Sequence, residues 1–157
     1  SFTEDMISTG KVPGAKLIGY KLVKGKEVPH VRDALKLSDE DFIHYFVRLR
    51  TGDNIPIAIS YTYLSTHIIP SLDIQVLENS LYKYIKKLGY QIQGIDAQYS
   101  AVIKKKKQKE LLKVDNIALF KSQHVTFLSD GTPFEYISTY YRGDQYTYSL
   151  KTIFKDN

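Results

Sequence analysis

The chain has 157 residues, of which 43% are hydrophobic, and this length and content fit one globular domain with a sizeable core. It contains no cysteine, which excludes disulfide bonds and thiolate metal sites, and no apolar stretch approaches the roughly 20 residues of a membrane span. The amino terminus is unlike a signal peptide. We therefore expect a cytoplasmic protein without a membrane partner.

The net charge of +5 would suit an anionic partner, but much of the excess comes from one lysine cluster at residues 104–109. Such a run is usually a solvated helix face, and this one leads into a short helical pattern at residues 110–112. The cluster has no interleaved aromatic residues, which a single-strand binder would use to stack bases. We expect a solvated helix, with contact to a nucleic-acid backbone as the alternative.

In the first half of the chain, a turn signal at Pro13-Gly14 precedes a predicted strand at residues 16–23. Residues 31–37 have the spacing of a short amphipathic helix. Strict alternation at 42–50 is the clearest strand pattern, and after a turn at 52–54 a second strand follows at 56–63. These two strands are expected to form a hairpin.

In the second half, residues 79–89 predict a helix with a capping residue at its start and Gly89 at its end. A β-rich stretch at 92–103, the lysine-rich helix and a strand at 117–128 follow. A last hairpin is expected from strands at 134–141 and 145–154. Strands grouped in hairpins with a few helices predict an α+β domain on a mostly antiparallel sheet.

Two arginines, Arg48 and Arg50, lie two residues apart just before the predicted turn. In a strand this spacing puts both side chains on one face. Two guanidinium groups on one face can clamp a phosphate or carboxylate, because each offers planar donors for bidentate binding. The alternative is an exposed basic edge on a surface strand.

Five motifs follow one another along the chain: SFTEDM at 1–6, RLR at 48–50 with IPIAI at 55–59, NSLY at 79–82, DGTPFE at 130–135 and YRGDQY at 141–146. In this order they resemble the UTRA domain, the effector-binding domain of GntR-type transcription regulators of the HutC subfamily. The opening and closing motifs look most like the regulators of N-acetylglucosamine use, which respond to hexosamine phosphates.

This resemblance implies a fold similar to chorismate lyase, with residues 1–157 forming one UTRA domain. It also implies a homodimeric regulator that binds DNA through an amino-terminal winged helix-turn-helix domain absent from this chain. Neither a cofactor nor a metal is expected. The implied partner is a small anionic effector, such as a hexosamine 6-phosphate.

For the phosphate of the effector, the resemblance assigns Arg48, Arg50 and Ser80, together with Phe2 and Thr3 from the opening segment. A helix amino terminus carries free amide donors that suit an anion, which independently favours Ser80. A plain helix cap is the alternative role for this serine, and the two roles are compatible.

For the sugar, the resemblance assigns Glu135 and Tyr141, which share one face of a strand because six residues separate them. A carboxylate can accept two sugar hydroxyls, and a tyrosine offers a hydroxyl and a flat wall. A surface glutamate and a core tyrosine are the alternatives. Arg142 lies an odd number of residues from Glu135, so in a strand its side chain points to the other face. It is expected to pair with Asp144.

Ser60 departs from the family pattern, since hexosamine-responsive relatives often carry an acidic residue at this point. A serine is shorter and uncharged, so a contact to the sugar would be lost or bridged by water. The phosphate clamp would be unaffected. Relatives also bind other phosphorylated sugars, phosphonates and small organic acids, so the identity of the effector stays open.

An enzyme resembling chorismate lyase is the competing function, with Glu135 as general acid or base and the arginines holding a carboxylated substrate. Against it, the four histidines are scattered, and none forms a recognisable motif with Glu135. Each histidine is expected to be structural or exposed. We therefore expect a sensor and not an enzyme.

Overall fold

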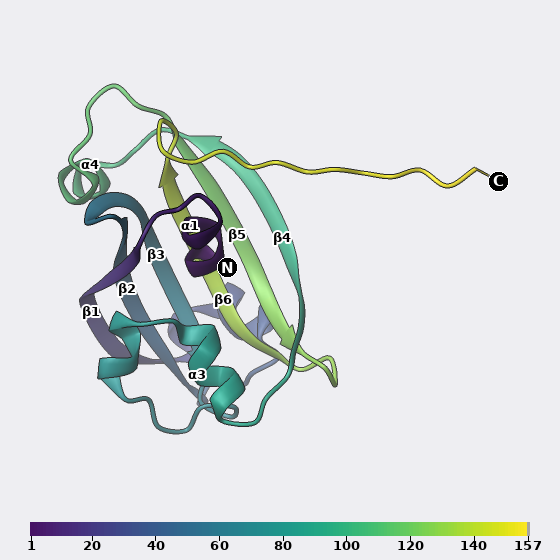
Figure 1. Ribbon diagram of the computed structural model, residues 1–157. Helices are drawn as coiled ribbons and strands as arrows, with labels where there is room; N and C mark the ends of the chain where they lie inside the picture. The colour runs from purple at the N-terminus through teal and green to yellow at the C-terminus, as the bar shows by residue number, and fades with distance from the viewer. Residues whose placement is uncertain (157) are drawn as a thin grey trace.

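Six antiparallel strands form one sheet in the computed structural model, which describes residues 1–156 (Figure 1). The strand order is β1-β2-β3-β6-β5-β4. The strands are β1 (Pro13–Lys24), β2 (Phe42–Gly52), β3 (Ile55–Ser65), β4 (Ile92–Val102), β5 (Leu119–Leu128) and β6 (Pro133–Arg142). The helices are α1 (Phe2–Ser8), α2 (Pro29–Ala34), α3 (Leu81–Lys87) and α4 (Lys106–Leu112), with 3-10 turns η1 (Gly25–Glu27) and η2 (Ile74–Glu78). The predicted α+β class is confirmed.

The sheet consists of two three-stranded meanders, β1-β2-β3 and β4-β5-β6, which meet where β3 pairs with β6. In this central pairing Ala58 lies opposite Tyr141, and Leu64 lies opposite Glu135. Residues that are far apart in the sequence therefore lie side by side at the middle of the sheet.

One face of the sheet carries α1 and α3, which lie apart from each other over its strands (Figure 1). The helix α3 buries Leu81 and Ile85 against Phe46 and Phe134. At the other end of this face, α1 buries Phe2 and Met6 in a cluster that includes Tyr141. The strand positions between the two helices are polar, and they form the candidate site.

The opposite face is covered at its two ends. Val31 and Leu35, in and just after α2, pack against Ile43 in one cluster, and Leu112 of α4 packs against Ile59 in another. The solvated face of α4 carries the lysines, as the sequence predicts. Half-buried tyrosines of β2, β3 and β6 fill the space between these clusters.

The predicted hairpin of β2 and β3 is confirmed, with Arg48 opposite Ser60 and Leu49 opposite Ile59. Its turn residues Asp53 and Asn54 have φ angles of 51° and 64°. Positive φ at both turn residues is typical of the type I′ turn, whose twist matches that of the flanking strands.

Three predictions about elements need correction. Residues 145–154 are not a strand, because no described segment pairs with them. The helix expected at 31–37 lies at Pro29–Ala34, where the fixed φ of Pro29 begins it, and the one expected at 79–89 is shortened to Leu81–Lys87. Helix α1 was not predicted, although Ser1 and Glu4 form a capping box at its start.

Candidate functional site

A cavity of about 590 Å³ lies between α1, α3 and the sheet. This volume is within the range of about 300–1,000 Å³ that small-molecule sites occupy. Its walls include every site residue expected from the sequence: Phe2, Thr3, Arg48, Arg50, Ser60, Ser80, Glu135 and Tyr141. The structure thus brings together residues from five separate elements.

Arg48 lies at the end of the cavity next to α3, and only 3% of it is exposed. Its Nη1 donates to the backbone carbonyls of Leu77 and Asn79 at 3.4 and 3.2 Å. These carbonyls orient the guanidinium without neutralising it. Burial lowers the pKa of Arg48, although the charge of Glu135 acts in the opposite direction.

Arg50 lies next to α1 and is 6% exposed. Its Nη2 donates to Thr3 Oγ1 at 3.4 Å, and its guanidinium carbon lies 4.4 Å from the centre of the Phe2 ring. Burial lowers the pKa of Arg50 to about 9, and the nearby positive charge of Arg48 adds to this effect. The two arginines therefore repel each other inside the cavity wall.

Neither arginine forms an ion pair with a carboxylate in residues 1–156, and the buried Nε atom of each lacks a hydrogen-bond partner there. Buried arginines are normally paired, because an isolated charge is costly to remove from water. The pair therefore presents two guanidinium groups without an ion-pair partner to the cavity, and the exposed basic edge considered from the sequence is wrong because both side chains are buried.

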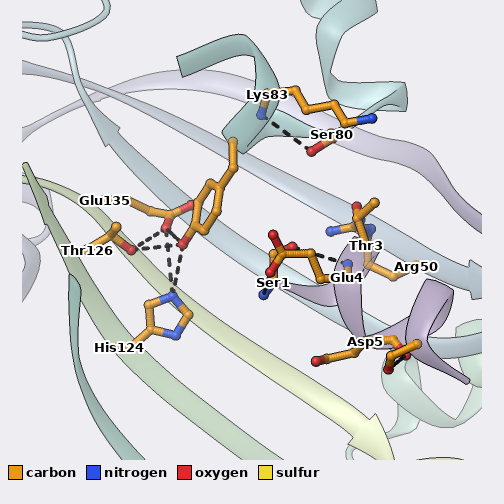
Figure 2. A network of polar contacts seen from close by, with 12 residues as sticks. Ser1, Thr3, Glu4, Asp5, Arg50, Ser80, Lys83, His124, Thr126 and Glu135 are labelled. Carbon is orange, nitrogen blue, oxygen red and sulfur yellow. Dashed lines mark hydrogen bonds and ion pairs between the residues drawn. The ribbon is translucent and has the colours of Figure 1, made fainter. Parts of the chain in front are cut away.

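Glu135 lies on β6 and is almost fully buried. Its Oε1 accepts hydrogen bonds from Thr126 Oγ1 at 2.6 Å and Tyr82 Oη at 2.8 Å, and His124 Nε2 lies 3.7 Å away (Figure 2). Burial alone raises the pKa of Glu135, but His124, Thr126 and Tyr82 together outweigh it and hold that pKa below its ordinary value. The site therefore keeps an ionised carboxylate in its wall.

Aromatic rings form the wall on the β6 side of the cavity. Tyr141 stacks on Tyr146 with 3.9 Å between ring centres, and the Phe2 ring lies 6.4 Å from Tyr141. Phe120 continues the stack 5.7 Å from Tyr146. Burial raises the pKa of Tyr141, so its hydroxyl stays protonated and can donate a hydrogen bond.

The remaining predicted residues have simple placements. Ser80 is the N-cap of α3 and accepts a hydrogen bond from the Lys83 backbone amide at 3.4 Å (Figure 2), so the capping role is confirmed. Ser60 is buried on β3 in the cavity floor. Arg142 Nη2 pairs with Asp144 Oδ2 at 2.8 Å, as expected from the sequence.

Three polar residues around Glu135 were not predicted from the sequence as members of the site. Tyr82 was included in a motif without a role, and Thr126 was not considered. His124 was expected to be structural or exposed, but it lies in the cavity wall. The signal is strand register: Thr126 lies opposite Glu135, and His124, two residues away, shares its face.

Within residues 1–156, no group of three or more His, Cys, Asp or Glu side chains is arranged to hold a metal ion. None of the helices described is long and apolar enough to cross a membrane.

The model of the UTRA domain matches residues 8–147. The chain belongs to the UTRA family. Among curated relatives of this UTRA domain, the transcriptional repressor NagR of Bacillus subtilis strain 168 is 29% identical over 94% of the chain and 61% of its own length. The transcriptional regulator GmuR of the same strain is 31% identical over 76% of the chain and 51% of its own length. The chain thus spans roughly half to three fifths of these relatives.

Solved structures show the same fold as this UTRA domain. The effector domain of PhnF from Mycobacterium smegmatis superposes with a TM-score of 0.86 at 21% identity, covering 98% of the chain and 94% of that domain. A GntR-family transcriptional regulator from Enterococcus faecalis V583 superposes with a TM-score of 0.79 at 26% identity. The superposition covers 88% of the chain and 99% of the chain in that structure.

Proposed function

We propose that this UTRA domain is the effector sensor of a GntR-family transcription regulator and binds a phosphorylated sugar, such as a hexosamine 6-phosphate. The observation that carries the proposal is the pair of buried guanidinium groups, Arg48 and Arg50, without a carboxylate partner among residues 1–156. A phosphate offers the charge and the acceptor oxygens that this pair lacks.

The phosphate would sit between the two arginines, because each guanidinium faces the cavity from its own end of the clamp. Its oxygens would take up the donors that remain free and reduce the repulsion between Arg48 and Arg50. Thr3 and Ser80 would add hydroxyl groups from α1 and from the start of α3.

The sugar would extend from the clamp toward Glu135. Glu135 Oε1 is already held by Tyr82 and Thr126, so its position is fixed before a ligand arrives. A carboxylate fixed in this way discriminates between ligands through the hydroxyl or amino group placed next to it. The stacked rings of Tyr141 and Tyr146 offer a flat wall for the apolar face of the sugar.

In the full-length regulator, which we expect to be a cytoplasmic homodimer, a DNA-binding domain would precede residue 1. Helix α1 comes first in this chain and carries both Thr3 and Phe2, which contact Arg50. A ligand at the clamp would therefore bias the position of α1, and through it that of the DNA-binding domain. Such a ligand acts only through different affinities for the two arrangements.

Calorimetry with glucosamine 6-phosphate, N-acetylglucosamine 6-phosphate and the unphosphorylated sugars tests the proposal. We expect binding of at least one phosphorylated sugar and a loss of about tenfold to hundredfold in affinity for Arg48→Ala and Arg50→Ala. Arg32→Ala is the matched control, because Arg32 pairs with Asp33 and Asp39 away from the cavity. Unchanged affinity in both clamp variants, or tighter binding of the unphosphorylated sugars, would contradict the clamp.

The enzyme alternative is not favoured, because the curated relatives are transcription regulators. The lowered pKa of Glu135 also makes it a poor proton donor at neutral pH. Incubation with chorismate checks this point: we expect no product, and turnover that is lost in Glu135→Gln would revive the enzyme.

A further inference from the structure

Of the four histidines in the chain, all of them within the described residues, His124 alone lines the cavity. It lies on β5, between Ile137 of β6 and Ala97 of β4. Its side chain is 16% exposed, so the ring is largely withdrawn from water. Neither strand neighbour has a polar side chain, so the side-chain partners of the ring come from other positions.

The contacts around Glu135 assign the protons of this group (Figure 2). Tyr82 Oη and Thr126 Oγ1 each carry one proton, and each donates it to Glu135 Oε1, at 2.8 and 2.6 Å. His124 Nε2 lies 3.4 Å from Tyr82 Oη and 3.7 Å from Glu135 Oε1, and both oxygens then have only lone pairs to offer. Nε2 therefore carries a proton, because an unprotonated nitrogen would face two acceptors.

The second ring nitrogen decides the charge of His124. With Nε2 protonated, the ring is neutral while Nδ1 is unprotonated, and it is positively charged when Nδ1 also holds a proton. Among the histidine contacts within residues 1–156, none involves Nδ1 of His124. The hydrogen bonds around Glu135 are therefore compatible with both states, and the two states differ in the charge beside the carboxylate.

The charge of His124 acts directly on Glu135. Burial raises the pKa of Glu135, and His124 opposes this effect more strongly than Thr126 or Tyr82 does. Arg48 and Arg50 also interact with the charge of Glu135, but the phosphate of the effector would neutralise them. His124 thus sets the net charge at the sugar end of the site.

We propose that His124 is a specificity-determining residue, whose charge selects the group of the effector that Glu135 accepts. While His124 is neutral, Glu135 presents an unbalanced carboxylate, which favours a cationic ammonium group. When His124 is protonated, it forms an ion pair with Glu135 and repels an ammonium group, so a neutral hydroxyl group is favoured. This role rests on the proposed function, because it concerns the sugar end of the same site.

Other titratable groups face the cavity from the surrounding elements. They are Tyr82 from α3, Tyr99 from β4, Tyr141 from β6, Arg48 and Arg50 from β2, Asp5 from α1, and Lys11, Tyr146 and Tyr148 from segments outside the helices and strands. Burial raises the pKa of Tyr82 and that of Tyr99, the tyrosines on the α3 and β4 sides of the ring. Comparison of the wild type with His124→Gln separates His124 from all of these groups, since only the imidazole is changed.

An NMR titration of the ligand-free protein tests the coupling, with the side-chain carboxyl carbon of Glu135 as the probe. His124→Gln keeps a hydrogen-bond donor but cannot gain a charge. We expect Glu135 to take up its proton at a higher pH in His124→Gln than in the wild type. His67→Gln is the matched control, because His67 pairs with Asp41 at 3.0 Å and lies outside the cavity. Identical titration of Glu135 in the wild type and His124→Gln would overturn the inference.

Calorimetry at pH 5 and pH 7 with glucosamine 6-phosphate and glucose 6-phosphate tests the selection. Both ligands carry a phosphate whose second pKa is about 6, so the ratio of their dissociation constants cancels its titration. The amino group resembles an α-amino group, with a pKa of about 7.7–8.0, and stays largely charged in this range. We expect the preference of the wild type for the amino sugar to fall about tenfold or more from pH 7 to pH 5. In His124→Gln this preference should stay constant.

His124→Arg places a permanent charge beside Glu135 and mimics the protonated histidine. We expect this variant to show the low-pH preference of the wild type at both pH values, which a purely structural His124 would not produce. A preference that depends equally on pH in the wild type and His124→Gln would overturn the inference even if the phosphate clamp is correct. If neither sugar phosphate binds the wild type, the proposed function fails, and the NMR comparison alone decides the role of His124.

Discussion

At the scale of single residues, Arg48 and Arg50 hold buried charge that no ion pair in the described chain neutralises. Most buried arginines are paired, and replacing a buried ionic group by an apolar one is often neutral or stabilising. The clamp therefore weakens the ligand-free fold in exchange for readiness to bind. Such a conflict between stability and binding is typical of functional sites.

Arg50→Met makes this conflict measurable. Because the folded pKa of Arg50 is about 9 and its ordinary value is 12.5, the unfolded chain holds this proton more tightly than the folded one. Stability from this group therefore rises as the pH increases through about 9. We expect the free energy of unfolding of Arg50→Met to exceed that of the wild type by about 1–3 kcal/mol at pH 7. This difference should narrow above pH 9.

Urea unfolding of both proteins between pH 7 and 10.5 provides the test. Other titrating groups contribute nearly equally to the two proteins, so the difference isolates Arg50. Arg32→Met serves as the control, because its partners raise the pKa of Arg32 and no gain in stability is expected. A wild type more stable than Arg50→Met at pH 7 would contradict this account.

At the scale of elements, helix α1 packs directly against the clamp, through the contacts of Phe2 and Thr3 with Arg50. It is held by Phe2 and Met6, which are buried, while Ile7 on the same helix is exposed. A seven-residue helix is not stable alone, so its packing on the sheet decides where it lies. The contact between Phe2 and Arg50 makes that packing depend on the charge in the clamp.

Phe2→Ala should therefore weaken effector binding although it leaves both arginine charges of the clamp in place. We expect about a tenfold loss of affinity for the phosphorylated sugar, because the cation–π contact and the position of Thr3 are lost together. Calorimetry of Phe2→Ala beside Ile7→Ala makes the measurement. Equal affinities in the two variants would show that α1 plays no part in the site.

The elements also show which parts of the fold the sequence predicts. The alternation at residues 42–50 and the turn after it predicted the β2–β3 hairpin, and the cap at Ser80 predicted the start of α3. The same alternation misled at 145–154, because a periodic pattern reports that a segment can form a strand and not that a partner is present. Helix α1 was missed because its seven residues include only three apolar ones, of which Phe2 and Met6 are buried, and this gives too little periodicity.

The candidate site was predicted less evenly than the fold. Spacing alone predicted the pair Arg48 and Arg50 and the helix amino terminus favoured Ser80, whereas the other five predicted residues came from comparison with the family pattern; the structure brings all eight into one cavity. His124, Thr126 and Tyr82 were missed because their roles depend on strand register and on the placement of α3 over the sheet. Neither can be read from residue spacing within a single segment.

At the scale of the whole molecule, the aromatic stack runs from Phe2 at the clamp through Tyr141, Tyr146 and Phe120 to Tyr148, whose ring lies 4.5 Å from that of Tyr99 on β4. The proposed effector site and the β4 edge of the sheet therefore belong to one packed structure. Linkage requires that any effect of the effector on the proposed homodimer be matched by an effect of dimerisation on effector affinity.

We expect dimerisation to change the effector affinity of each site, by a factor in the range of about 5 to 150 that is typical of such coupling. Since each copy carries one site, saturating effector should change the dimer dissociation constant by the square of this factor. Sedimentation with and without the phosphorylated sugar gives one side of the cycle, and calorimetry at protein concentrations above and below the dimer dissociation constant gives the other. Dimerisation that is indifferent to ligand would show that the stack transmits nothing.

The meeting of the two meanders at β3 and β6 has a consequence for the order of folding. Within each meander the connections between paired strands are shorter than residues 66–132, which separate β3 from β6. The pairing of β3 with β6 must therefore overcome a larger loop entropy. This seam is expected to form late and to open early. Arg48 and Arg50 lie on one side of this seam, and Glu135 and Tyr141 lie on the other. An effector that contacts both groups would therefore hold the two meanders together and slow the unfolding of the domain.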